Sequence, residues 1–146
     1  MEPRLDYKAA SPNAFKAMLA LEAAVGKLGI EPSLLELIKL RASQLNGCAF
    51  CVDMHATDAL KAGETPRRLN AVAVWREAPF FTARERTALA WTESLTLLPQ
   101  THASDEDYEQ LRAQFSESEM VNISLAICTI NSWNRLAVGF RAMPPA

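Results

Sequence analysis

Three side chains suited to redox or metal chemistry lie close together in the sequence: Cys48, Cys51 and His55. A spacing of three and then four residues places them on one face of a helix, which turns by about 100° per residue. A helix that begins at the cysteines also supplies positive potential and free N–H groups, and both favour thiolate over thiol. The pattern indicates a reactive dithiol beside an imidazole that can take a proton from either thiol, directly or through one water.

Glu36 adds a carboxylate at a spacing that permits contact with this cluster. It lies eleven residues before Gly47, which is about 16 Å along its own helix at 1.5 Å per residue. If the chain reverses at Asn46-Gly47, His55 lies about 10 Å along the returning helix, which leaves an axial offset of about 6 Å that side chains can span. We expect a relay from Glu36 through His55 to a thiol, in which the carboxylate orients the imidazole or receives its proton. The alternative is a glutamate on the helix surface.

Helices must position these residues, because helical spacing and helix caps occur along nearly the whole chain. The expected helices run from Pro12 to Gly29, from Pro32 to Asn46, from Cys48 to Ala62, from Pro66 through Trp75, from Thr82 to Pro99, over a short acidic segment after Ser104, and from Ser116 through Val138. No alternating strand pattern and no internal repeat is present. The sequence therefore predicts an all-α fold, a single compact domain of about six to seven helices over residues 1–146.

Composition and charge argue against several classes of protein. The formal net charge is -2, and no basic region suited to nucleic acid is present. The first residues carry no apolar signal core, and no apolar run is long enough to span a bilayer, so we expect a cytoplasmic protein. Three cysteines, two of them in a Cys-x-x-Cys, do not fit the evenly paired framework of a small secreted domain.

Other polar residues are assigned structural roles. Cys128 lies in an apolar helix and is predicted to be buried packing, whereas His102 is predicted to lie on the surface. Asn131, Asn134 and Arg135 form a polar stripe on an otherwise apolar helix. Such a stripe is more typical of a subunit contact or of internal hydrogen bonding than of catalysis.

The central pattern resembles the carboxymuconolactone decarboxylase superfamily and, within it, the AhpD-like alkylhydroperoxidases. Those enzymes carry a glutamate, eleven intervening residues, Cys-x-x-Cys, three residues and a histidine. Glu36, Cys48, Cys51 and His55 occupy all four places, and the similarity centres on residues 33–65. The resemblance implies that these four residues are the catalytic set of an AhpD-like helical domain.

The same resemblance implies a peroxidase that needs no cofactor beyond its dithiol. A thiolate reduces a small organic hydroperoxide and becomes a sulfenic acid, which is resolved as a disulfide between Cys48 and Cys51. A reducing thiol protein or a lipoyl-bearing partner then restores the dithiol. Because members of the family form trimers and hexamers, a homo-oligomer of that kind is also implied.

One residue departs from the best-known family member, which has a second histidine immediately before its second cysteine. This chain has Phe50 there. The substitution makes the expected pocket more apolar and removes a proton carrier, while the dithiol chemistry stays intact. The decarboxylase branch of the superfamily fits less well, because its activity does not use the cysteine pair.

The roles of the two cysteines and the function class retain alternatives. Cys51, one turn before His55, is expected to attack and Cys48 to resolve, although the helix dipole favours Cys48. The two cysteines, His55 and Glu36 are also acceptable zinc ligands, but structural zinc sites usually draw ligands from two separated pairs. A third alternative is a non-catalytic helical module whose dithiol only senses redox state.

Overall fold

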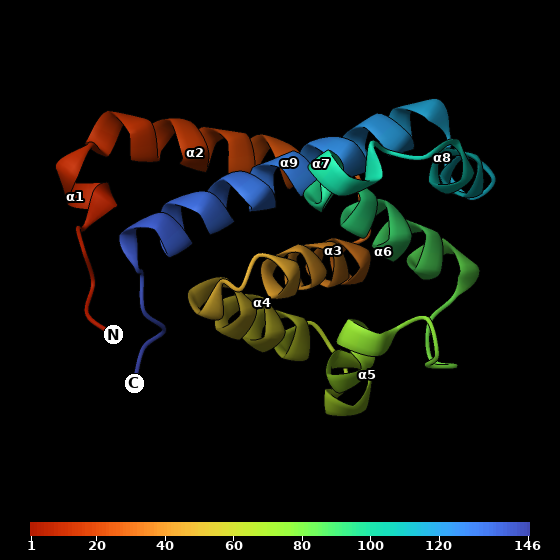
Figure 1. The fold of residues 1–146 in the computed structure, drawn as a ribbon, viewed down its shortest axis with the longest axis horizontal. Helices are drawn as coiled ribbons and strands as arrows, with labels where there is room; N and C mark the ends of the chain where they lie inside the picture. Colours follow the sequence, from red (N-terminus) through yellow and green to blue (C-terminus); the bar gives the residue numbers. More distant parts are fainter.

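The structure, a computed structural model, covers residues 1–146 and contains nine α-helices, one 3₁₀ turn and no strand. The elements are α1 (Tyr7–Ala10), α2 (Pro12–Val25), α3 (Pro32–Leu45), α4 (Ala49–Lys61), α5 (Pro66–Ala71), η1 (Val72–Val74), α6 (Ala83–Thr96), α7 (Leu98–Thr101), α8 (Asp105–Arg112) and α9 (Glu117–Phe140). Figure 1 shows α2 alongside α9, with the α3–α4 pair next to α9. The predicted all-α class is confirmed.

Two helices of four residues each, α1 and α7, raise the number of helices above the six to seven expected. A single helical turn is too short to show apolar periodicity, so such helices are not predicted from the sequence pattern. In α1, the Asp6 carboxylate accepts hydrogen bonds from the N–H groups of Lys8 and Ala9 at 3.0 and 3.2 Å. Pro99 does not end the preceding helix as expected: α6 ends at Thr96, and the proline occupies the first turn of α7, where its missing N–H leaves no helical bond unmade.

The hairpin of α3 and α4 is the part of the fold that positions the central motif. Gly47 has a φ of 64°, a left-handed conformation that glycine adopts without the Cβ penalty of other residues. The N–H of Gly47 donates to the Gln44 carbonyl at 3.2 Å, and the N–H of Cys48 donates to the Ser43 carbonyl at 3.0 Å. These two bonds form a Schellman motif, which caps α3 and reverses the chain. The helix that begins at the cysteines therefore returns along α3.

Helix α3 is held rigidly because apolar clusters pack on two of its sides. Leu37 and Leu40 belong to a cluster with Val72, Trp75, Leu89 and neighbouring residues of α4–α6. Leu34 and Ile38 belong to a second cluster with Leu111 of α8, Ile123 and Ile127 of α9, and Phe115 of the segment between these helices. Leu37 and Ile38 are completely buried, so truncation of either to alanine is expected to cost about 2–5 kcal/mol.

A buried carboxylate, that of Glu93 on α6, ties three elements together. Its oxygens accept hydrogen bonds from Arg41 Nε at 2.8 Å, from Trp75 Nε1 at 2.9 Å, and from Arg76. Burial alone would raise the pKa of Glu93, but the bonds from Arg76, Trp75 and Arg41 outweigh it and lower the pKa below its ordinary value. The helix that was expected to continue through Trp75 ends at Ala71 and passes into η1. The bonds from Trp75 and Arg76 to Glu93 hold the chain directly after η1.

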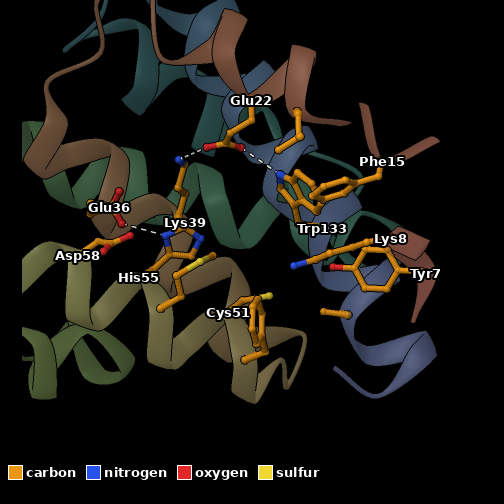
Figure 2. Close-up of a pocket in the computed structure, with 14 residues that line it drawn as sticks. Tyr7, Lys8, Phe15, Glu22, Glu36, Lys39, Cys51, His55, Asp58 and Trp133 are labelled. Carbon is orange, nitrogen blue, oxygen red and sulfur yellow. Dashed lines mark hydrogen bonds and ion pairs between the residues drawn. The ribbon is translucent and has the colours of Figure 1, made fainter. Parts of the chain in front are cut away.

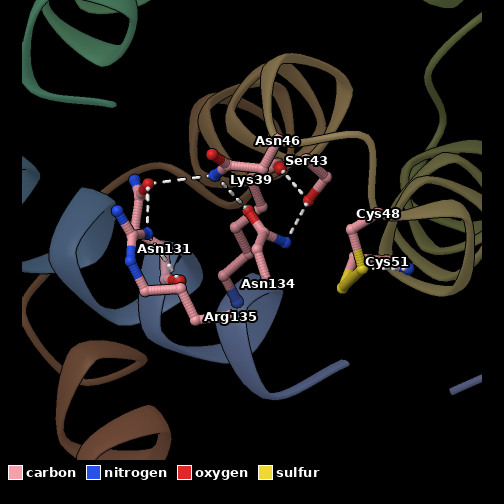
Figure 3. The surroundings of a disulfide bond; sticks show 8 residues. All are labelled: Lys39, Ser43, Asn46, Cys48, Cys51, Asn131, Asn134 and Arg135. Carbon is pink, nitrogen blue, oxygen red and sulfur yellow. Dashed lines mark hydrogen bonds between the residues drawn. A yellow bond between two sulfur atoms is a disulfide. The ribbon is translucent and has the colours of Figure 1, made fainter. Parts of the chain in front are cut away.

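Hydrogen-bonded amides fix the α3–α4 turn to α9 (Figure 3). Asn46 Nδ2 donates to the Oδ1 atoms of Asn131 and Asn134, both at 2.9 Å. Asn134 in turn donates to Ser43 Oγ at 3.0 Å, and Arg135 donates to Asn131 Oδ1 at 3.0 Å. The polar stripe on α9 thus makes the internal hydrogen bonds that were one of its two expected roles. It anchors the turn that immediately precedes Cys48.

The N-terminal segment docks on the end of α9, and both termini lie on that side of the molecule (Figure 1). The N–H of Arg4 donates to the Phe140 carbonyl at 3.0 Å, and its guanidinium donates to the Gly139 carbonyl at 3.1 Å. The ring of Tyr7 lies against that of Phe140, with 5.9 Å between the ring centres. This docking holds α1 beside the α4–α9 contact. None of the helices combines the length and apolar character that crossing a membrane requires.

Candidate redox site

The two cysteines lie at the N-terminus of α4 and form a disulfide, with their Cα atoms 5.3 Å apart. Cys48 is the N-cap residue, and its sulfur accepts a hydrogen bond from the N–H of Cys51 at 3.3 Å. Both side chains are 2% exposed and pack against Ala137 of α9, with Ala142 at the edge. The helix N-terminus places both sulfurs near backbone N–H groups that favour a thiolate formed on reduction, whereas burial among apolar side chains acts against it.

Only one of the two cysteines faces the main pocket of the molecule, which has a volume of about 300 Å³. Cys51 lines this pocket, whereas Cys48 does not. The pocket is formed where α1, α2, α3, α4 and α9 meet (Figure 2), and its lining residues are Tyr7, Lys8, Phe15, Leu19, Glu22, Glu36, Lys39, Phe50, Cys51, Met54, His55, Asp58, Trp133 and Ala137. A small molecule in the pocket would therefore meet Cys51 first.

The structure brings Glu36 and His55 together in the same pocket. Glu36 Oε2 lies 2.9 Å from His55 Nδ1, and the side chains are 17% and 7% exposed. The hydrogen bond joins α3 to the middle of α4. The two side chains therefore span the axial offset of about 6 Å that was expected from the sequence. With Nδ1 held by the carboxylate, Nε2 is the imidazole nitrogen that remains for proton exchange with a ligand or thiol. Glu36, Cys51 and His55 thus share one pocket, and Cys48 lies behind it.

A second charged pair in the pocket was missed by sequence reasoning. Lys39, one turn after Glu36 on α3, is 6% exposed, and its ammonium pairs with Glu22 of α2. The other carboxylate oxygen of Glu22 accepts from Trp133 Nε1 of α9 at 3.1 Å. These bonds connect three helices across the pocket (Figure 2). The available signal was the lone charge of Glu22 in an apolar helical segment, whereas Lys39 has Glu36 and Arg41 close by in the sequence.

Aromatic residues make up much of the remaining wall. Phe15 and Trp133 meet edge to face, with 6.0 Å between ring centres. Phe50 is half-buried and lines the pocket. It occupies the position of the second histidine in the best-known family member. The Lys8 ammonium lies 5.4 Å from the centre of the Phe15 ring and 5.9 Å from that of Phe50. Burial, assisted by the negative charge of Asp6, raises the pKa of Tyr7 above its usual value.

Two predictions about single residues have opposite outcomes. His102 is exposed, as predicted. The prediction that Cys128 is buried packing is wrong, because this thiol is exposed. The apolar helix α9 has an outward stripe as well as a buried one, and Cys128 follows the exposed Val121 and Leu125 on that outward side at helical spacing. An apolar sequence alone did not distinguish the two faces.

The zinc alternative gains no support from the geometry. No group of three or more His, Cys, Asp or Glu side chains converges in a way that could hold a metal ion. The cysteine sulfurs are bonded to each other, and the Glu36 carboxylate contacts the imidazole. The arrangement instead suits proton transfer beside a two-electron thiol–disulfide couple.

Comparison with known proteins adds four findings. The model of the carboxymuconolactone decarboxylase family matches residues 12–94, a span that includes the whole candidate site. The uncharacterized protein YdfG of Bacillus subtilis is 40% identical over 138 residues, which cover 94% of each chain. A crystal structure of a protein of unknown function from Agrobacterium tumefaciens, with a suggested assignment as the antioxidant defence protein AhpD, is 48% identical, has a TM-score of 0.98 and covers 99% of each chain. The debrominase Bmp8 shares the fold, with 21% identity, a TM-score of 0.84 and coverage of 92% of this chain and 73% of that one.

Proposed function

Because this chain belongs to the carboxymuconolactone decarboxylase family, in its AhpD-like branch, we propose that it is a thiol-dependent peroxidase and disulfide oxidoreductase that reduces small organic hydroperoxides. The proposal rests chiefly on one observation. Cys51, His55 and Glu36 line the same small pocket, and the second cysteine of the pair is bonded to Cys51 from outside that pocket. This arrangement supports a substrate site at Cys51, with the proton relay in the same pocket and the resolving thiol behind it.

In the first step, the thiolate of Cys51 attacks the outer oxygen of the hydroperoxide. The O–O bond breaks, Cys51 becomes a sulfenic acid, and the departing alkoxide takes the proton that His55 removed from the thiol. Glu36 stabilises the imidazolium between these two proton transfers, because its carboxylate holds Nδ1 at 2.9 Å. Each residue is thus assigned one role: nucleophile, proton carrier and orienting carboxylate.

In the second step, Cys48 resolves the sulfenic acid. Its sulfur attacks the sulfur of Cys51, the S–OH bond breaks, and the hydroxyl leaves as water with the proton of the second thiol. The two electrons given to the peroxide come from the sulfur pair, so the cycle needs no other cofactor. The Cα separation of 5.3 Å lies within the ordinary range for a disulfide and supports this step.

A reducing partner completes the cycle by thiol–disulfide exchange. We propose a dithiol for this role, carried by a thiol protein or by a lipoyl-bearing protein, because a dithiol releases both cysteines without leaving a mixed disulfide. We also propose a homo-oligomer, a trimer or hexamer. Val121 and Leu125 on the outer side of α9 are exposed apolar residues that support an association surface.

The proposal is tested by peroxide consumption with several dithiol donors, followed alongside a count of free thiols. Cys128→Ser provides the background, because it removes an exposed thiol that lies outside the site and would confuse the count. Without donor, one peroxide should be consumed for each pair of thiols lost; with a suitable donor, turnover should follow. Disulfide formation without turnover under any donor would favour the redox-sensing alternative. Consumption that persists in Cys51→Ser would contradict the proposal.

A further inference from the structure

One end of the pocket carries a positive charge that has no acidic partner. Lys8 of α1 lines the pocket and takes part in none of the ion pairs of the chain, whereas Lys39 is paired with Glu22. The rings of Phe15 and Phe50 lie close to the Lys8 ammonium, at 5.4 and 5.9 Å. Aromatic rings attract a cation without neutralising it. Lys8 is exposed, and its ammonium lies on the Cys51 side of the pocket in Figure 2, with its N–H donors free for a ligand.

A second hydrogen-bond donor lies next to this ammonium. The Tyr7 hydroxyl stays protonated over the physiological range, because the ordinary pKa of tyrosine is about 10 and burial first and the charge of Asp6 second raise it further. Figure 2 shows the Tyr7 hydroxyl and the Lys8 ammonium both pointing towards the part of the pocket beside Cys51. An ammonium and a phenol hydroxyl at one place are suited to a carboxylate, which only accepts hydrogen bonds.

Two of the three carboxylates that line the pocket, those of Glu36 and Asp58, lie at the other end, and the third, that of Glu22, is paired with Lys39. Glu36 contacts His55, and Asp58, which lies 3.6 Å from Lys61, is on the same side in Figure 2. Because the Lys39 charge is paired with that of Glu22, an anionic ligand is attracted to the unpaired ammonium at the α1 end and repelled by Glu36 and Asp58 at the His55 end. This asymmetry would orient a ligand that carries one negative charge.

The middle of the pocket is suited to an apolar body of limited size. Phe15, Trp133 and Phe50 supply flat apolar walls, with Phe15 and Trp133 packed edge to face. A volume of about 300 Å³ is at the small end of the range for ligand pockets. One aromatic ring or a short branched chain fills such a space, while a long acyl chain does not.

We propose that Lys8 and Tyr7 form a carboxylate subsite, and that the preferred substrates are hydroperoxides of small carboxylic acids with an aromatic or branched apolar body. The inference rests on the proposed peroxidase function and names its substrate class. The carboxylate is bound and not altered: the O–O bond breaks at Cys51 and the acid leaves with an alcohol in place of its hydroperoxide. Lys8 and Tyr7 are positioning residues for this reaction.

Binding is measured first, on the oxidised protein, so that no turnover is needed. The probes are para-isopropylbenzoate and para-isopropylbenzamide, which share a shape and differ in charge, and affinities are measured by calorimetry. The benzoate should bind more tightly than the amide, and Lys8→Gln should weaken the benzoate by about tenfold, or 1.4 kcal/mol. Lys8→Arg should recover most of this loss. Lys16→Gln is the matched control, because Lys16 is an exposed lysine on the neighbouring helix that does not line the pocket.

Selectivity is measured next, with cumene hydroperoxide and its para-carboxylate. The ratio of kcat/KM for the acid to that for the neutral peroxide should exceed one, and Lys8→Gln should lower this ratio by about tenfold. Tyr7→Phe should lower it less, and Lys16→Gln should leave it as in the parent. A ratio rather than a rate is compared, so that a general loss of activity in a variant does not count as a loss of selectivity.

The outcomes separate this inference from the proposed function. Benzoate binding that depends on Lys8, in a protein that turns over neither peroxide, would uphold the subsite and overturn the peroxidase assignment. Turnover of both peroxides with the same ratio in the parent and in Lys8→Gln would overturn the subsite and leave the peroxidase. A Lys8 dependence seen only with a carboxylate-bearing dithiol donor would also overturn the inference, because it would assign the charge to the reducing partner.

Discussion

The bond between Glu36 and His55 is the most direct test of the proposed mechanism. In Glu36→Gln the amide oxygen can still accept from Nδ1–H, so the 2.9 Å geometry is retained and only the negative charge is lost. A hydrogen bond to a charged group exceeds a neutral one by about 1–1.5 kcal/mol, which is about tenfold in rate. Loss of effective general base catalysis costs about 10²-fold at its lower end. We therefore expect thiolate formation to slow by about 10-fold to 10²-fold.

The assay follows iodoacetamide alkylation of the reduced protein and peroxide consumption between pH 6 and 9. This window is chosen because an unperturbed thiol ionises near pH 8.5. As pH rises, the thiol ionises without help from the relay, so the gap between Glu36→Gln and the parent should narrow. His55→Ala should be at least as damaging as Glu36→Gln and should show the same narrowing.

The control is Glu106→Gln, which makes the same chemical change at an exposed glutamate on α8, away from the site. It should leave both rates as in the parent. A gap that stays constant across the pH range would show that Glu36 supports the structure rather than proton transfer. Parent rates in both Glu36→Gln and His55→Ala would refute the relay.

Four further predictions concern the cysteines, the buried charges and the assembly. After peroxide treatment, Cys48→Ser should accumulate a sulfenic acid on Cys51 that a trapping reagent labels; labelling seen only in Cys51→Ser would reverse the two roles. Glu93 has a lowered pKa in the folded protein, so its stabilising effect is complete above the ordinary carboxyl pKa of about 4.3 and is lost as pH falls below it. Urea unfolding should show Glu93→Gln destabilised by about 3 kcal/mol at pH 7, with the difference from the parent shrinking towards pH 3; a difference independent of pH would contradict the charge argument. Glu22→Gln leaves the buried Lys39 ammonium without its carboxylate and should lower the free energy of unfolding by about 3 kcal/mol. The double variant with Lys39→Met should lose less, because no unpaired charge is then buried. An equal or greater loss in the double variant would contradict the argument from charge pairing. Light scattering should give a mass above that of the monomer, and a stable 16.1 kDa species at micromolar concentration would exclude the proposed homo-oligomer.

The helix starts were predictable because their determinants are local. The capping boxes at Thr82 and Ser116 are formed as the sequence indicates, with the hydroxyl and the glutamate side chain each bonding to the backbone of the other residue. The approach of Glu36 to His55 followed from helix geometry once the turn at Gly47 was recognised. Local spacing fixes distances along a helix hairpin, so this part of the site could be inferred before any tertiary contact was known.

The rest of the pocket depends on contacts between segments far apart in the chain. Lys39 is buried because α2 brings the Glu22 carboxylate to it, and the residues near Lys39 in the sequence do not predict this contact. Lys8 reaches the pocket because Arg4 fastens the N-terminal segment to the end of α9. Cys128 lies on the outward side of a helix whose two faces are both apolar. These features result from tertiary packing, which a one-dimensional pattern does not record.

The hairpin of α3 and α4 also restricts where residues can be inserted into this chain. One residue inserted between Glu36 and the turn would rotate the glutamate by about 100° and move it about 1.5 Å along the axis, away from His55. A compensating shift of the turn is blocked, because Asn46 is bonded to both Asn131 and Asn134 on α9. Loops on the surface tolerate insertions at a small entropic cost, but this stretch does not. Among relatives that use the same relay, the number of residues from Glu36 to His55 should therefore stay constant even where the residues between them differ.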